Sequence, residues 1–213
     1  MTYLFFAVFD QPLEDEKFQA LLRLLPVDHH EKILRYVMWQ DRHASLFGKL
    51  LLQKGLEKFH YKSPLHLEYS QYSRPYLPDF TNLDFNISHT KKAVACVISD
   101  CRRVGIDIEE ISDIKISDFK NQWTDTEYQN IFEAEDSKVA FFNYWTKKEA
   151  VLKADGRGLN IALNQIDVTG YAVLVEGKTW HLKACDLIKN HVTHLCSDIP
   201  IDEEEVVVES VIF

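Results

Sequence analysis

The sequence of 213 residues predicts an α+β fold, with helices and antiparallel strands in mixed order along one chain. Two observations support this prediction. Three segments place apolar residues at helical spacing, whereas much of the remaining chain consists of short β-branched or aromatic runs separated by turn residues. An apolar share of 46% is enough for a core of substantial size.

The first third of the chain predicts a strand followed by two helices. Residues 1–10 are apolar, but they lack a basic flank and a cleavage site and are too few to span a membrane, so we expect a first strand. A helix is expected to start at the N-cap residue Asp28, three positions before Glu31, and to continue to Met38. A second helical pattern ends near Gly55, and prolines between residues 61 and 84 mark loops and edge segments.

The rest of the chain predicts a hairpin, a long helix and further strands. Residues 93–98 and 104–109 are short apolar runs joined by the polar residues 100–103, a pattern typical of a β-hairpin. Residues 136–154 contain no proline or glycine and repeat aromatic side chains at helical spacing, which predicts a helix that ends at Gly156. Strand-like runs follow at 171–175, 180–187 and 206–213.

Composition restricts the classes of partner. A net charge of −9 at pH 7 opposes adhesion to nucleic acid and to anionic membranes, so we expect neither as a partner. The four cysteines show none of the paired spacings used in zinc or redox sites, and we therefore expect reduced thiols in a cytoplasmic protein. The chain has no Walker-type phosphate loop, no dinucleotide fingerprint and no Gly-x-Ser-x-Gly elbow.

The strand predicted at residues 104–109 carries two carboxylates on one face. Alternate side chains of a strand share a face, so Asp107 and Glu109 project together, opposite Ile106 and Ile108. The two charges repel each other unless a hard cation lies between them. Taken alone, the pattern fits an ordinary amphipathic strand better than a metal site.

The long helix carries a second candidate group. Trp145, Glu149 and Lys153 are spaced at i, i+4 and share one stripe. A carboxylate and an ammonium in this arrangement can bind magnesium and a phosphate side by side, but a surface ion pair explains them equally well. Lys147 and Lys148 either hold anionic groups near this stripe or solvate the helix.

Histidines supply a third candidate. In residues 85–90, expected to form a loop before the hairpin, hydroxyl side chains flank His89, and hydroxyls and imidazole suit phosphate oxygens. Such residues are also common in loops without a function. We interpret His43, His181, His191 and His194 as structural; the last two form only a weak metal-like cluster with Cys196.

Three segments have the order and spacing of the motifs of one enzyme family. They are residues 86–90 (Asn-Ile-Ser-His-Thr), 105–109 (Gly-Ile-Asp-Ile-Glu) and 145–153 (Trp-Thr-Lys-Lys-Glu-Ala-Val-Leu-Lys). The chain thereby resembles the Sfp-type 4′-phosphopantetheinyl transferases from about residue 28 to residue 159. Thr90 stands where the family usually has serine and keeps the hydroxyl. The resemblance implies a pseudo-dimer of two similar α+β halves with antiparallel sheets, residues 1–100 and 101–213, and coenzyme A bound in the cleft between them.

The resemblance also implies the site residues. Asp107, Glu109 and Glu149 are the expected magnesium ligands, and Lys153 is expected to meet the pyrophosphate; Asp107, Glu149 and Lys153 form the expected catalytic set. Besides Lys153, the expected contacts to coenzyme A are His29, Lys32, Ser45, Arg74, Ser88 and His89. His29 stands where the family often has a further basic residue, so its contact is expected to depend on pH.

The implied activity is magnesium-dependent transfer of the phosphopantetheine group of coenzyme A to a serine of an apo acyl or peptidyl carrier protein, by a monomer. Two alternatives stay open: a metal-dependent phosphodiesterase or nucleotidyl transferase, and a catalytically silent module that only binds carrier proteins. Carrier proteins of this kind are acidic, as is this chain, so docking requires locally basic and apolar surface. Residues 111–123, with Lys115 and Lys120, are the candidate.

Overall fold

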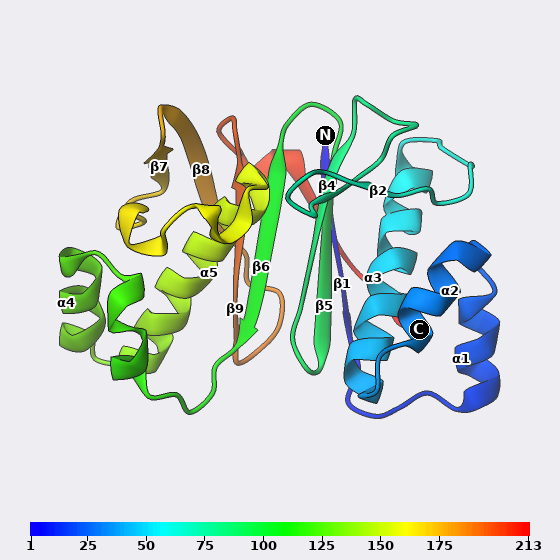
Figure 1. Ribbon diagram of the computed structural model, residues 1–213, viewed down its shortest axis with the longest axis horizontal. Helices are drawn as coiled ribbons and strands as arrows, with labels where there is room; N and C mark the ends of the chain where they lie inside the picture. Colours follow the sequence, from blue (N-terminus) through cyan, green and yellow to red (C-terminus); the bar gives the residue numbers. More distant parts are fainter.

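The computed structural model describes residues 1–213, with all side chains except those of Leu159 and Glu203. Two four-stranded sheets lie side by side at the centre, and helices cover the outer face of each (Figure 1). One apolar core lies between the two sheets, and further cores lie between each sheet and its helices. The predicted α+β class is confirmed.

The first sheet has the strand order β10-β1-β5-β4. Its members are β1 (Thr2–Val8), β4 (Asp84–His89), β5 (Ala93–Ser99) and β10 (Val206–Ser210). The outer face is covered by α1 (Asp15–Leu22), α2 (Val27–Leu34) and α3 (Trp39–Lys58). Strand β10 pairs parallel with β1 at the edge of the sheet, so the last strand of the chain joins the same sheet as the first. The predicted division into two halves at residue 100 stays a prediction.

The second sheet is antiparallel throughout, with the order β6-β9-β8-β7. Its members are β6 (Val104–Glu110), β7 (Ala172–Val175), β8 (Lys178–Ala184) and β9 (His191–Ser197). Its outer face is covered by α4 (Asp125–Glu133) and α5 (Ser137–Asp155). Gly105 lets α5 lie directly on β6, because a Cβ at that position would stand 2.2 Å from the Ala150 carbonyl oxygen.

Short elements complete the chain. A small hairpin of β2 (Glu68–Tyr69) and β3 (Pro75–Tyr76) lies in the segment predicted as loops and edges. The 3₁₀ helices are η1 (Ile116–Gln122), with seven residues, and the single turns η2 (Gly158–Asn160), η3 (Leu163–Gln165) and η4 (Glu203–Glu205). Among the described residues, no helix has both the length and the apolar character that a membrane span requires.

The predicted hairpin of residues 93–109 is wrong. Strand β5 is already paired on both edges, with β1 and β4, so it has no free edge for β6. The polar residues 100–103 instead carry the chain from the first sheet to the second, where β6 pairs with β9. The prediction of a loop at residues 85–90 is also wrong, because most of these residues belong to β4. Strand β9 was not predicted.

Two helix boundaries also differ from the prediction. Helix α2 begins at Val27 with Pro26 as its N-cap residue, so Asp28 lies within the first turn and offers no side-chain cap. The helix ends at Leu34, which leaves Met38 outside it, whereas α3 continues beyond Gly55 to Lys58. The long helix is confirmed: Asp136 caps its start, and Gly156 ends it with a positive φ of 89°.

The two sheets meet along β4 and β6 without a main-chain ladder. Alternate side chains of β4 point to the same side and accept the amide hydrogens of β6. The three pairs are Asp84 with Val104 (2.8 Å), Asn86 with Ile106 (3.0 Å) and Ser88 with Ile108 (3.3 Å). This ladder of side chains joins the two halves of the molecule and continues into the site described next.

Candidate active site

The three sequence motifs converge where β4, β6 and α5 meet. The ammonium of Lys153 on α5 donates to Asp107 Oδ1 on β6 (2.5 Å) and to Ser88 Oγ on β4 (2.8 Å). The Ser88 hydroxyl in turn donates to Asp107 Oδ1 (2.9 Å). One member of each motif is therefore held in a single hydrogen-bonded group at the junction of the two halves.

Negative charge exceeds positive charge at this junction. Burial, together with the charge of Asp107, raises the pKa of Glu109 to about 7. Burial and the charge of Asp107 also raise the pKa of Glu149, while Lys153 acts in the opposite direction. The second oxygen of Asp107, Oδ2, is buried and has no partner among the described residues. Three carboxylates thus share one ammonium and leave an acceptor unsatisfied.

This donor set fits a hard cation, which prefers carboxylate oxygens. In the described part of the chain, however, no three acidic, histidine or cysteine side chains converge tightly enough to form a metal site. Lys153 lies against Asp107 instead. The expected ligand set of Asp107, Glu109 and Glu149 therefore stays a prediction.

Two cavities extend from the junction over the surface. One of about 200 Å³ is lined by Glu149 and Lys153 together with Arg74 and residues of the loop before β3. The other, of about 550 Å³, is lined by Lys32, Arg35, Tyr36, Tyr69 and Ser73. Ser73 lines both cavities; the first includes Glu149 and Lys153 of the junction, and the second includes Lys32 and Arg35.

Both halves of the chain match models of the same protein family. Residues 11–101 match the model described as "4′-phosphopantetheinyl transferase, N-terminal", and residues 103–196 match the 4′-phosphopantetheinyl transferase superfamily. The transferase gsp of Aneurinibacillus migulanus is 33% identical over 168 residues, which cover 77% of this chain and 70% of gsp. The chain belongs to the 4′-phosphopantetheinyl transferase family.

Other transferases of the family are similarly related. The Sfp enzyme of Bacillus subtilis is 28% identical over 75% of this chain and 72% of its own length, and HetI of Nostoc is 29% identical over 81% and 77%. These relatives confirm the resemblance to Sfp-type transferases. They support transfer of phosphopantetheine to carrier proteins and favour it over the phosphodiesterase and binding-module alternatives. The solved structure of the holo-[acyl-carrier-protein] synthase of Thermotoga maritima aligns with 44% of this chain and with 61% of the synthase chain. The TM-score is 0.35 and the sequence identity is 18%, so this similarity supports no conclusion.

In this transferase, the predicted coenzyme A contacts lie in three different settings. Lys32 is exposed on α2, with its ammonium 4.6 Å from the centre of the Tyr69 ring. His29 is buried, its Nε2 lies 2.9 Å from the Leu65 carbonyl oxygen, and burial lowers its pKa. His89 is exposed at the end of β4. The predicted contacts of these residues with the nucleotide stay predictions.

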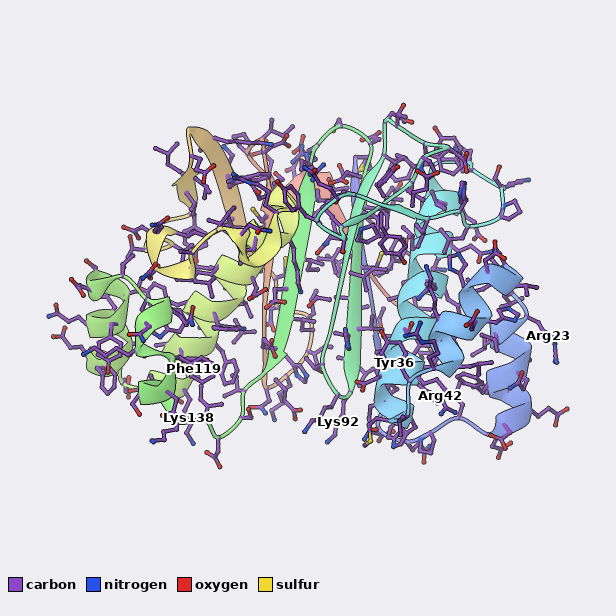
Figure 2. The ribbon with its side chains drawn as sticks, in the orientation of Figure 1. Arg23, Tyr36, Arg42, Lys92, Phe119 and Lys138 are labelled. Atoms are coloured by element: carbon purple, nitrogen blue, oxygen red, sulfur yellow. The ribbon has the colours of Figure 1, made fainter. Side chains whose placement is uncertain are left out.

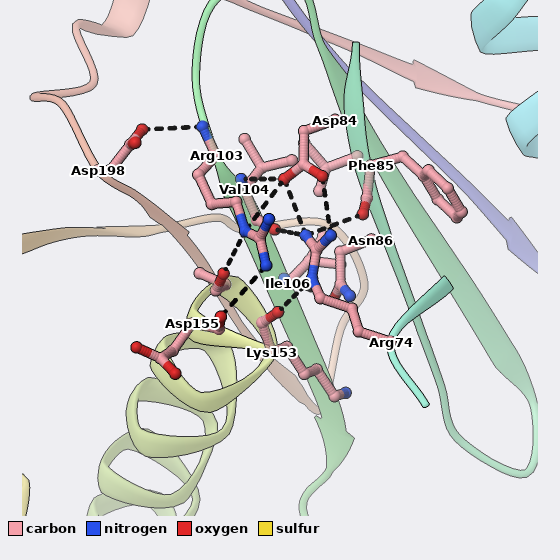
Figure 3. A network of polar contacts seen from close by, with 12 residues as sticks. Arg74, Asp84, Phe85, Asn86, Arg103, Val104, Ile106, Lys153, Asp155 and Asp198 are labelled. Atoms are coloured by element: carbon pink, nitrogen blue, oxygen red, sulfur yellow. Dashed lines mark hydrogen bonds and ion pairs between the residues drawn. The ribbon is translucent and has the colours of Figure 1, made fainter. Parts of the chain in front are cut away.

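Arg74, by contrast, is fully engaged inside the transferase, as Figure 3 shows. Its guanidinium forms a two-pronged ion pair with Asp84 (2.8 Å for each oxygen) and donates to the carbonyl oxygens of Lys153, Phe85 and Val104. Arg103 donates to the next carbonyl oxygens along α5. The two arginines therefore cap the C-terminal end of the helix that carries Lys153.

The Arg74→Ala variant is expected to be less stable by about 3 kcal/mol, because it removes the two-pronged partner of the nearly buried Asp84 and leaves that carboxylate with Arg103 at 3.9 Å as its remaining counter-charge. Lys32→Ala is the matched control, since Lys32 is exposed and its loss should change stability by less than about 0.5 kcal/mol. Thermal unfolding and a coenzyme A titration of both variants separate the two roles. An Arg74→Ala protein with normal melting and weakened binding would show that the predicted nucleotide contact outweighs this structural role.

The two lysines next to the catalytic stripe have structural roles. Lys148 is fully buried, forms an ion pair with Glu127 (2.7 Å) and donates to the carbonyl oxygens of Leu163 and Ile166. Lys147 is buried as well; it donates to the Val168 carbonyl oxygen and lies over the Tyr171 ring. Both sequence-based interpretations are wrong for Lys148, which is fully buried and paired, whereas Lys147 is mostly buried and engaged with Val168 and Tyr171.

The histidines interpreted as structural behave accordingly where their contacts are defined. The His43 ring accepts the Leu13 amide hydrogen (3.0 Å), and His194 is buried with its Nδ1 2.8 Å from Thr146 Oγ1. Burial lowers the pKa of His194 to about 3, which keeps it neutral at ordinary pH. Asp84 and Asn86, which were not predicted, matter for the junction; polar residues at alternate positions before Ser88 are the pattern that indicates them.

Proposed function

We propose that this transferase uses magnesium to move the phosphopantetheine group of coenzyme A to a carrier-protein serine. The observation that best supports the proposal is the charge balance at the junction, where three carboxylates face one ammonium and Asp107 Oδ2 lacks a partner. Asp107, Glu109 and Glu149 are the residues that would hold the ion. When bound, magnesium would stabilise the charge of the pyrophosphate and of the departing adenosine 3′,5′-bisphosphate.

The side chains of this transferase have separate tasks in the proposed reaction. The serine oxygen attacks the β-phosphorus, a new P–O bond forms, and the P–O bond to the bisphosphate breaks. Lys153 is placed to exchange its contact with Asp107 for one with a phosphate oxygen, and Ser88 adds a hydroxyl donor. We assign Glu149 first to the metal and second to accepting the serine proton, because a carboxylate that binds a cation has a lowered pKa and is a weaker base.

We propose that the carrier docks along residues 111–123. Lys115 and Lys120 are exposed there, whereas the apolar side chain of Trp123 packs against α5. Figure 2 places the nearby Phe119 and Lys138 at the same lower edge of the molecule as Arg42 and Lys92 of the other half. Lys115 pairs with Asp118 and Lys138 pairs with Asp113 on this edge, so an acidic partner would be met mainly by Lys120, Arg42 and Lys92. We further propose a cytoplasmic monomer that binds neither nucleic acid nor membrane.

Mass spectrometry of an apo carrier protein incubated with the enzyme, coenzyme A and magnesium tests the function. One phosphopantetheine group should be added per carrier, with an equal amount of adenosine 3′,5′-bisphosphate, and a chelator should stop both products. A carrier with alanine in place of the acceptor serine is the control. Bisphosphate release that continues undiminished with this control would identify water as the acceptor and favour a hydrolase.

A further inference from the structure

Cys101 is the exposed cysteine among the four in the chain, and it lies in residues 100–103, which connect the first sheet to the second. Burial raises the pKa of the Cys96 and Cys196 thiols, and it raises the pKa of Cys185 to about 11. The thiolate is the reactive form of cysteine, so these three thiols react slowly near neutral pH. Cys101, in contrast, is open to reagents in solution.

A cavity of about 580 Å³ adjoins Cys101. The loop between β3 and β4 supplies part of its wall, and Cys101, Arg102 and Arg103 supply another part. Asp84, at the start of β4, also lines it, whereas Ser88 lies four residues farther along this strand, at about 13 Å. The cavity is therefore separate from the catalytic group, and its volume suits a small organic ligand.

Arg102 supplies a buried positive charge to this cavity. Its side chain is 4% exposed, pairs with Glu205 and donates to the Pro200 carbonyl oxygen. Burial opposes this charge, but the contacts of the guanidinium with Glu205 and with the Cys101 sulfur outweigh burial and raise the pKa of Arg102. The Nε of Arg102 is buried and has no partner among the described residues. A buried donor without an acceptor indicates a ligand that supplies one.

Arg103 supplies a second positive charge, closer to solvent. Its side chain is 40% exposed and donates to two carbonyl oxygens at the end of α5. The two acidic residues of the cavity are already engaged, because Asp84 pairs with Arg74 and Asp198 accepts the Arg103 amide hydrogen (Figure 3). The cavity therefore favours a ligand with carboxylate groups over a cationic ligand.

We propose that Cys101 forms mixed disulfides with small thiols that carry carboxylate groups, which Arg102 and Arg103 recognise in the adjoining cavity. The Cys101 thiol gives its proton to solvent, and its sulfur attacks one sulfur of a small-molecule disulfide, which is the oxidant. A new S–S bond forms, the original S–S bond breaks, and the other half leaves as a thiolate. This inference does not depend on the proposed function, since Ser88, Asp107 and Lys153 do not line the cavity.

The test compares two disulfides as reagents for the wild-type enzyme: glutathione disulfide, which is anionic, and cystamine, which is a dication. Each rate is divided by the rate of the same disulfide with N-acetylcysteine amide, a neutral thiol, to remove the intrinsic difference in reactivity. A net charge of −9 alone favours cystamine, whereas we expect a preference for glutathione disulfide on the order of tenfold. Peptide mass spectrometry should place one glutathionyl group on Cys101, and Cys101→Ser should stay unmodified.

Arg103→Met tests the recognition of the carboxylates, and Lys62→Met is its matched control, because it removes the same charge from an exposed position outside the cavity. Arg103→Met should abolish most of the preference for glutathione disulfide, and Lys62→Met should keep it. An equal preference in the two variants, or a wild-type enzyme that reacts faster with cystamine, would overturn the recognition. A folded enzyme that forms no adduct at Cys101 would overturn the site. The wild-type ratio decides the proposal even if Arg103→Met lowers the melting temperature.

Discussion

Replacing Glu149 by glutamine is expected to slow transfer by on the order of a hundredfold or more. The substitution keeps the size and hydrogen-bonding reach of the side chain, but it removes one of the three charges proposed to hold magnesium. The fold should tolerate it, because burial and the charge of Asp107 already raise the pKa of Glu149 and make its ionised form unfavourable. Steady-state rates at increasing magnesium, measured beside a melting curve, are the readout.

Glu110→Gln is the matched control for Glu149→Gln. Glu110 follows Glu109 on β6, where its side chain projects to the other face of the strand, and the change should leave the rate within about twofold, since a half-buried residue outside the site alters little. Near-normal turnover of Glu149→Gln at ordinary magnesium concentrations would contradict both the ligand role and the base role of Glu149. A fall in melting temperature as large as the fall in rate would indicate that the residue acts through stability.

The largest effect on stability is expected from Lys148→Met, at about 3 to 5 kcal/mol. Lys148 and Glu127 are both fully buried, so the variant leaves a carboxylate without a counter-charge in the core. Glu127 has two further tasks: it caps α4 through the Thr124 amide and accepts the Val168 amide hydrogen. For a chain of this size, such a loss lowers the melting temperature by roughly 10 °C.

The double variant Glu127→Gln with Lys148→Met tests this explanation. It removes both charges, and the single amide oxygen can still accept one of the two backbone hydrogen bonds that Glu127 accepts, so it should recover part of the stability lost in Lys148→Met. Lys138→Met is the surface control, because Lys138 pairs with the exposed Asp113 and should contribute less than about 1 kcal/mol. If urea unfolding shows Lys148→Met to be as stable as Lys138→Met, the buried ion pair is not a main contributor.

The structure brings the three motifs to one junction, but at the nucleotide end it engages one of the expected contacts elsewhere. Asp107, Glu149 and Lys153 come together through β6 and α5 as their motifs predict. Arg74, expected at the nucleotide, is occupied by Asp84 and by three carbonyl oxygens. The contact of Ser45, another expected nucleotide residue, with the Lys49 ammonium on α3 was not predicted either, because an isolated lysine in a helix has the same sequence pattern whatever its partner is.

Local sequence by itself determined the elements whose pattern depends on neighbours a few residues apart. The long helix is one example: the aromatic spacing, the cap at Asp136 and the stop at Gly156 are all short-range features. The alternation of Asp107 with Ile106 and Ile108 is another, since the strand period alone directs the carboxylate away from the core. The functional roles of the three motifs came from the family resemblance and stay predictions, while the structure shows that Ser88, Asp107 and Lys153 contact one another.

Only the tertiary structure decided which strands pair and which charges are buried. Residues 93–109 look like a hairpin locally, but β5 uses both of its edges for β1 and β4, and β6 must pair elsewhere. Lys148 has the pattern of a solvated lysine, yet it lies under the loop that follows α5, where Glu127 meets it. Strand pairing and burial depend on contacts between residues far apart in the chain, and no short-range pattern contains them.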